Sequence, residues 1–267
     1  FGKIYYTKKG KGSPLLLIHD TMPGASGYEW SRVEDQLAQE HTVYTLDLLG
    51  CGRSEKAGIT YTNFLFVQII CDFIKNVIKE KTDIIASGFS CSFVTTAAAY
   101  DKESINKIMF INPVSMISLA QTTTKKDKLF NFFIELPIFG TFIYHIIVSR
   151  ETINDFFLDK LYYNPFHVDK DVLDAYYEAA HKGGYYAKCL YSSQSAKYMN
   201  INIRHAVESI DNSIYIVEGE DEPNGAAIVE AYQKVNPAIE SATIPCSKHF
   251  PHIENVDAFL EQVGAFF

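Results

Sequence analysis

The sequence predicts an α/β fold, with a mostly parallel central sheet, helices on both faces and an inserted helical cap. In the first half of the chain, short apolar runs rich in β-branched residues alternate with helical patterns. That alternation is typical of a parallel sheet covered on both faces. From about residue 113 to 202 the alternation stops, and the sequence is helical and rich in Phe and Tyr. We therefore expect a core of residues 1–112 and 203–267, with the cap at 113–202.

The individual elements follow from the local patterns. The expected strands lie at residues 2–6, 14–19, 42–47, 83–87, 107–112, 213–217 and 242–244. The expected helices of the core lie at 29–39, 61–80, 91–100, 226–235 and from 256 onward.

Composition limits the classes of function. A length of 267 residues, 47% of them hydrophobic and 21% charged, fits one globular domain with an insertion. A net charge of −8 without a Lys/Arg stripe excludes nucleic acid as the expected partner. Five cysteines without a CxxC pair favour free thiols in a reducing compartment, so we expect a cytoplasmic protein without disulfides or zinc. We expect a small-molecule substrate and no metal or organic cofactor, and the oligomeric state stays open.

Two features concern the start of the chain and membranes. The chain begins at Phe1 rather than at a methionine, so we expect a trimmed start, and a signal or anchor upstream stays open. Residues 129–147 are the only stretch that approaches the length of a membrane span. Pro137 and Gly140 interrupt it, which predicts two broken helices rather than one spanning helix. Contact of this apolar run with a membrane surface stays open.

Ser90 lies at the centre of the sequence GFSCS at residues 88–92, between an expected strand and an expected helix. A serine in such a loop is commonly a turn residue or a helix cap. A sharp strand-to-helix turn flanked by small residues, however, is the geometry that exposes a nucleophile above a sheet. The context therefore favours Ser90 as a candidate nucleophile.

A serine nucleophile needs a base, and the base needs an orienting acid. His249 and His252 lie in the loop after the last strand, at the edge of the sheet where Ser90 is expected. The loop at 218–222 has four carboxylates at the end of another strand, and a merely solvated acidic loop is the alternative. The chain order of serine, acid and histidine matches that of a hydrolase triad.

Four motifs resemble those of α/β-hydrolase-fold proteins with a helical cap, and the likeness covers nearly the whole chain. HDT at 19–21 is similar to the oxyanion loop of that family, and the stretch 23–30 resembles the loop of cap-bearing dehalogenases and epoxide hydrolases. DLLGCGRS at 47–54, GFSCS at 88–92 and KHFPHIE at 248–254 resemble the other three motifs.

The resemblance implies a particular site. It makes Ser90 the nucleophile, His249 the base and Glu222 the acid, with Asp221 as the second candidate for the acid. The backbone N–H groups of Thr21 and Cys91 would form the oxyanion hole.

The implied activity is that of a serine hydrolase that cleaves an ester-like bond of a small-to-medium apolar substrate through an acyl-enzyme. Phe133 and Phe142 of the cap are expected to wall the substrate pocket. A C–C hydrolase or lyase on the same triad, and a catalytically silent ligand binder, remain alternatives. Serine at position 90 excludes the dehalogenase and epoxide hydrolase chemistry, which uses a carboxylate nucleophile.

Three residues depart from the family pattern. Asp20, Ser92 and Lys248 each stand where the family has a glycine. A carboxylate pointed at a developing oxyanion would oppose catalysis, so we expect the Asp20 side chain to face away from the site, into its own loop.

Overall fold

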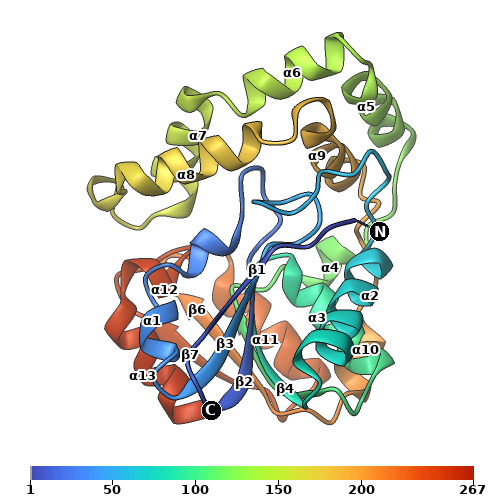
Figure 1. Ribbon diagram of the computed structural model, residues 1–267. Coiled ribbons are helices and arrows are strands. Elements are labelled where there is room, and N and C mark those ends of the chain that lie inside the picture. Colours follow the sequence, from blue (N-terminus) through green and yellow to red (C-terminus); the bar gives the residue numbers. More distant parts are fainter. Residues whose placement is uncertain (1) are drawn as a thin grey trace.

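The computed structural model describes residues 2–267 (Figure 1). Phe1 lies outside the described residues, and so does the expectation of a trimmed start. Its centre is a seven-stranded sheet in the order β1-β3-β2-β4-β5-β6-β7. Six strands run parallel, and only β1 pairs antiparallel, with β3. The strands are β1 (Tyr6–Lys9), β2 (Ser13–Ile18), β3 (His41–Leu46), β4 (Thr82–Ser87), β5 (Ile105–Ile111), β6 (Ile214–Gly219) and β7 (Glu240–Ile244).

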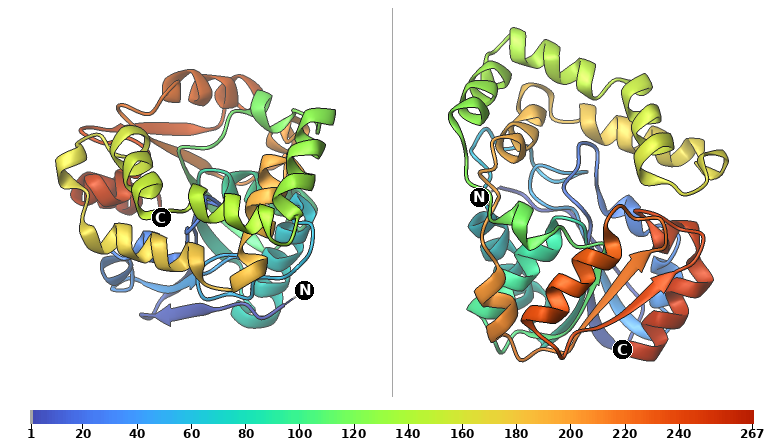
Figure 2. Two further views of the ribbon diagram at one scale, coloured as in Figure 1. Left: turned by 90° about the horizontal axis from the view of Figure 1, so that it is seen from above. Right: turned by 180° about the vertical axis from the view of Figure 1, so that it is seen from behind.

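Alternate residues of the buried strands face opposite layers of helices, as the two-residue period of a strand requires. On β2, Leu16 and Ile18 pack into the larger cluster under α2, α3, α10 and α11, whereas Leu15 and Leu17 pack under α1 and α13. Figures 1 and 2 show these two layers on either side of the sheet. The core helices are α1 (Glu34–Leu37), α2 (Asn63–Phe73), the π-helical turn η2 (Ile74–Ile78), α3 (Ser90–Tyr100), α4 (Met116–Leu119), α10 (Arg204–Ser209), α11 (Gly225–Val235), α12 (Pro251–Glu254) and α13 (Val256–Phe266).

A second body of helices, the cap, lies over the carboxyl ends of the strands (Figure 1). It comprises α5 (Lys125–Glu135), α6 (Phe139–Ile147), α7 (Arg150–Phe156), η3 (Phe157–Leu161), η4 (Pro165–His167), α8 (Lys170–His181), η5 (Gly184–Ala187) and α9 (Lys188–Ser195). It is narrower than the expected 113–202, because Met116 and Leu119 of α4 are buried in the core cluster.

Two expected elements differ from the structure. The expected strand at 2–6 is replaced by β1, because Lys3 and Tyr5 donate their backbone N–H groups to Glu55 and Ser54 instead of to a strand. The expected helix at 29–39 is divided into the 3₁₀ turn η1 (Gly27–Trp30) and the short α1. The buried Glu29 and Trp30 occupy that tight turn, so the chain does not continue as one helix.

Within residues 2–267, no single helix has the length and apolar composition needed to cross a membrane. The consecutive helices α5 and α6 meet that test only when taken together, and they are bent by 101° relative to each other. The expectation that residues 129–147 form two broken helices is confirmed.

Candidate active site

The strand-to-helix turn after β4 has its tip at Gly88. Its φ is +53°, in the left-handed region that side chains rarely adopt, and α3 begins two residues later at Ser90. A Cβ atom added at Gly88 would lie 2.3 Å from Cγ of Asp20. The position at which a nucleophile would project therefore has no side chain, and the carboxylate of Asp20 fills that space.

Ser90 does not occupy the expected place. It is fully buried in the first turn of α3, and its Oγ donates a hydrogen bond of 2.6 Å to the backbone oxygen of His19. No hydrogen bond joins Ser90 to His249 or Glu222 in the described part of the chain. The expectation that Ser90 stands at the tip of the turn is wrong, because the positive φ falls two residues earlier.

Two backbone N–H groups converge on the Asp20 carboxylate. Thr21 and Phe89 donate to its Oδ1 over 2.6 Å and 2.8 Å. Cys91 does not take part as expected, since its N–H points to the Gly88 oxygen at 3.4 Å within the turn. The expectation that Asp20 faces away from the site is wrong, because Gly88 leaves room for its carboxylate between the two amides.

His249 lies between two carboxylates. Its Nδ1 is 3.3 Å from Oε1 of Glu222, and its Nε2 is 3.4 Å from Oδ2 of Asp20. The structure therefore brings His249 and Glu222 together, in the arrangement that the sequence indicated. Asp221 is exposed, and its backbone N–H binds the oxygen of Ser247.

The two carboxylates determine the charge of the imidazole. Burial alone would lower the pKa of His249, but hydrogen bonds and charge from Asp20 and Glu222 outweigh burial and raise that pKa to about 10. Burial would raise the pKa of Asp20, but His249 and the two backbone amides hold it below its ordinary value. At neutral pH the site is an imidazolium held between two carboxylates.

Glu29 supports this site and was missed in the sequence, where it stands in an expected helix with no sign of burial. It is fully buried, and its Oε2 accepts the backbone N–H of Asp20 at 3.1 Å. Its Oε1 accepts the hydroxyl of Ser87 and lies 3.5 Å from Nε2 of His252. His252, also fully buried, stacks on Trp30, so its environment is that of a structural residue.

Two tyrosines of the cap have buried hydroxyl groups without a hydrogen-bond partner, namely those of Tyr162 and Tyr176. Both rings pack against Phe250, which follows His249 in the chain. Burial and the nearby charges of Glu29 and Asp20 raise the pKa of Tyr176 well above its ordinary value. Its hydroxyl therefore stays protonated and is available as a donor.

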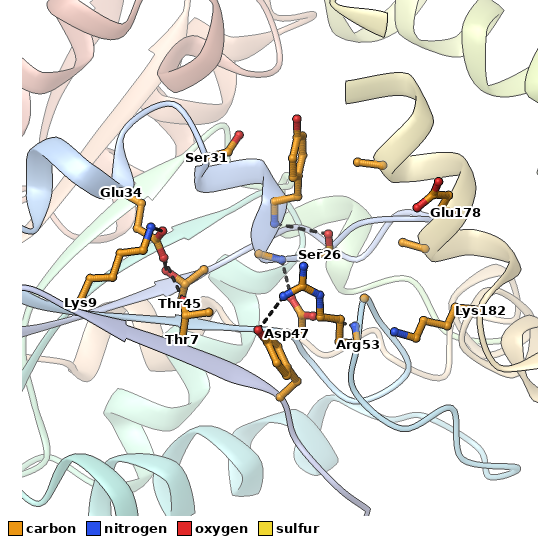
Figure 3. A pocket seen from close by; sticks show the side chains of 16 residues that line it. Thr7, Lys9, Ser26, Ser31, Glu34, Thr45, Asp47, Arg53, Glu178 and Lys182 are labelled. Atoms are coloured by element: carbon orange, nitrogen blue, oxygen red, sulfur yellow. Dashed lines mark hydrogen bonds and ion pairs between the residues drawn. The ribbon is translucent and has the colours of Figure 1, made fainter. Parts of the chain in front are cut away.

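A hollow of about 320 Å³ lies elsewhere, at the edge of the sheet near β1 and β3. Its lining includes Lys9, Glu34, Asp47 and Arg53, together with Lys182 of the cap (Figure 3). None of the three central site residues lines this hollow. A much smaller one, of about 10 Å³, lies beside Thr21 under the cap.

Phe133 and Phe142 do not wall either hollow. They are 41% and 64% exposed, on the α5 and α6 helices of the cap. The expectation that they line the substrate pocket is wrong, because these helices turn other residues inward: Ile134 and Tyr144 are buried.

Within residues 2–267, no group of three or more His, Cys, Asp or Glu side chains is arranged to hold a metal ion. The five cysteines are free thiols.

The fold agrees with comparisons to known proteins. The model of the Alpha/beta hydrolase family matches residues 15–262, so the chain belongs to that family. It is 28% identical over 114 residues to 2-hydroxy-6-oxo-6-(2'-aminophenyl)hexa-2,4-dienoic acid hydrolase from Metapseudomonas resinovorans, and 29% identical over 109 residues to soluble epoxide hydrolase from Corynebacterium sp. (strain C12). The matched stretches are 42% and 41% of this chain but only 39% and 37% of those relatives.

A solved meta-cleavage product hydrolase from Pseudomonas fluorescens IP01 has the same fold. It superposes with a TM-score of 0.76 over 99% of this chain and 93% of the other, at 18% sequence identity. The three proteins named here are all hydrolases by name.

Proposed function

We propose that this protein is a hydrolase whose nucleophile is the carboxylate of Asp20, assisted by His249 and Glu222. One observation carries the proposal: the Asp20 carboxylate occupies the space above Gly88, with Oδ1 on the amides of Thr21 and Phe89 and Oδ2 facing His249. One oxygen is thus held by a ready-made oxyanion hole, while the other is free to attack.

The nucleophile indicates the class of substrate. Attack of a carboxylate on an ester would give an anhydride, which is more reactive than the ester itself. Attack on a saturated carbon with a leaving group instead gives a stable ester. We therefore propose an alkyl electrophile, and an epoxide in particular, because the His249 imidazolium faces Oδ2 of Asp20 and can protonate a ring oxygen. The exclusion of epoxide chemistry expected from the sequence rested on a nucleophile at position 90, whereas the proposed nucleophile is Asp20.

In the first step, Oδ2 of Asp20 forms a bond to a ring carbon. The carbon–oxygen bond of the ring breaks, and its electron pair stays on the ring oxygen. That oxygen takes the proton of the His249 imidazolium and becomes a hydroxyl group. The step leaves an ester on Asp20 and a neutral imidazole.

In the second step, neutral His249 takes a proton from water, whose oxygen attacks Cγ of the Asp20 ester. The negative charge collects on Oδ1, where the amides of Thr21 and Phe89 stabilise it. Collapse expels an alkoxide, which takes the proton from His249. The new acid of Asp20 returns its own proton to His249, so the carboxylate and the imidazolium are restored.

The two steps need opposite charge states of His249, and the site provides them. With Asp20 ionised, both carboxylates raise the pKa of His249 to about 10, so it carries the proton for the first step. Esterification removes the negative charge of Asp20 and hence part of the attraction that raises this pKa. The imidazole is then a better base for the second step.

Isotope labelling tests the proposal. The enzyme, in excess over an epoxide such as styrene oxide, is allowed one turnover in water enriched in oxygen-18. We expect one oxygen-18 atom in Asp20, found by mass spectrometry in the tryptic peptide of residues 12–32, and a first diol free of the label. Asp20→Asn should abolish turnover, because the amide keeps the shape but is not nucleophilic.

Ser90→Ala is the matched control. It should leave turnover within about threefold of wild type, because it removes only the hydroxyl that binds His19. If Ser90→Ala instead abolishes turnover of an ester, and Asp20→Gly increases it by opening the oxyanion hole, the serine mechanism expected from the sequence holds. Label in the first diol and none in Asp20 would also overturn the proposal.

A catalytically silent ligand binder is the second candidate. The observation that favours it is that Asp20 fills the space between the amides of Thr21 and Phe89, and that neither of the two hollows described above is lined by Asp20 or His249. On that alternative, neither epoxides nor esters are turned over, and a reactive nitrophenyl glycidyl ether leaves no adduct on Asp20.

A further inference from the structure

We infer that the helical hairpin α5–α6 of the cap docks onto the surface of a lipid bilayer that contains anionic phospholipid. The hairpin consists of α5, residues 136–138 and α6, and it forms the side of the cap farthest from the sheet (Figures 1 and 2). This inference is independent of the proposed catalytic chemistry.

Exposed apolar side chains are concentrated on this hairpin. Of the 20 large hydrophobic residues that are exposed in the described chain, eight lie within residues 129–146. These eight are Leu129, Phe130, Phe132, Phe133, Ile138, Phe139, Phe142 and Ile146. Soluble proteins seldom expose so many neighbouring apolar side chains unless that surface binds something.

The apolar surface belongs to a rigid, preformed element. A Cβ atom at Gly140 would lie 1.8 Å from the oxygen of Ile134, so the two helices are in close contact where the hairpin turns. The buried Lys188 of α9 donates to the oxygen of Leu136 and to the hydroxyl of Thr141. The exposed side chains are therefore held in position before any partner binds, which reduces the entropic cost of docking.

Basic side chains border the apolar ones. On α5, the exposed Lys125, Lys126 and Lys128 each stand four residues, or about one helical turn, before an exposed apolar residue. Residues 125–150 contain four basic and two acidic side chains, whereas the whole chain has a net charge of −8. A positive margin beside an apolar tip is complementary to anionic headgroups above acyl chains.

The lengths of the two helices and the bend between them exclude a hairpin that spans the bilayer and favour one that lies at its surface. The nine residues of α6 are about 14 Å long, compared with about 30 Å for the hydrocarbon core of a bilayer. The bend of 101° between α5 and α6 prevents them from acting as one straight span. A second copy of the chain fits less well, because a two-fold contact of this face with itself would bring basic margins together.

Vesicle cosedimentation tests the inference on the full chain. We expect binding to phosphatidylcholine vesicles that contain about 30% phosphatidylserine, weaker binding to pure phosphatidylcholine, and a reduction by salt. Ile138→Glu with Phe142→Glu should lower the partition coefficient at least tenfold, because the tip can no longer enter the acyl boundary. Replacing Lys125, Lys126 and Lys128 by Gln should lower it by about fivefold for each lysine, on anionic vesicles only.

Ile117→Glu with Phe64→Glu is the matched control, because it changes two exposed apolar residues of the core and should leave binding unchanged. Thermal unfolding checks that the variants are folded. If the tip variant, Ile138→Glu with Phe142→Glu, is unfolded, the lysine variant still tests the inference. The inference is overturned if wild type binds neither vesicle, or if the tip and lysine variants bind like wild type. It is also overturned if sedimentation shows a dimer that the tip variant dissociates.

Discussion

Asp20 is the residue on which the proposed chemistry depends, and its effect on His249 is measurable without any substrate. Of the two carboxylates beside the imidazole, Asp20 faces Nε2 and Glu222 faces Nδ1. In Asp20→Asn the negative charge at Nε2 is lost, but Glu222 remains. We expect the pKa of His249, followed by NMR, to fall by at least about one unit from its value of about 10.

Glu222→Gln is the companion variant, and it should also lower the pKa of His249, because it removes the other carboxylate. A pKa that is unchanged in both variants would show that the two carboxylates do not control the charge of His249.

The turn after β4 is the element at which the proposed site departs from the serine site expected from the sequence. Gly88→Ala should be destabilising for two reasons, namely the φ of +53° and the approach of the new Cβ to 2.3 Å from the Asp20 carboxylate. We expect a loss of about 2–4 kcal/mol in the free energy of unfolding, measured by urea denaturation.

Gly184→Ala provides the matched control. Its φ is +58°, but no atom lies within 4 Å of the added Cβ, so only the backbone penalty of about 1 kcal/mol applies. The difference between the two variants measures the contact with Asp20. Equal losses would mean that the carboxylate moves away without cost.

The sequence predicted the strands and helices better than it predicted which residue stands at the tip of the turn after β4. The strand β2 contains a continuous apolar run, PLLLI at residues 14–18, whose burial on both faces follows from its composition. The sequence does not distinguish Gly88 from Ser90 as the tip, because small residues stand on both sides of Phe89, at 86–88 and at 90–92. The family pattern favours the serine. The backbone angles place the tip at the glycine.

The direction of the Asp20 side chain could not be predicted locally. It depends on the absence of a side chain at Gly88 and on the amide of Phe89, 69 residues away in the sequence. The Glu222–His249 contact was predictable, by contrast, because both residues lie in loops at the carboxyl ends of neighbouring parallel strands. The residues that surround Glu29 in the sequence do not indicate that its side chain is buried.

At the scale of the whole molecule, the pKa of His249 links stability to pH. It is raised from about 6.5 to about 10 on folding, so between these pH values the folded state binds more protons than the unfolded state. The stabilisation is therefore complete below about pH 6.5 and is lost as the pH rises through about 10. We expect the free energy of unfolding to fall by up to about 1.4 kcal/mol per pH unit in that window.

Urea denaturation of wild type and His249→Gln at several pH values checks this. Lysine and tyrosine side chains also titrate near the upper limit, so the informative quantity is the difference between the two proteins. That difference should shrink as the pH rises. Parallel pH profiles would contradict the raised pKa.

The cap is joined to the site by backbone hydrogen bonds, and this affects how fast a ligand can bind. The N–H of His249 donates to the oxygen of Leu161, and Tyr163 donates to the side chain of Glu254. Neither the hollow at the edge of the sheet nor the one beside Thr21 is lined by Asp20 or His249, so we expect a ligand to reach Asp20 after the cap shifts and these bonds break. Association should then be slower than binding to a preformed, open site, because a conformational change has to precede it. Its observed rate should level off at high ligand concentration, at the rate at which the cap opens.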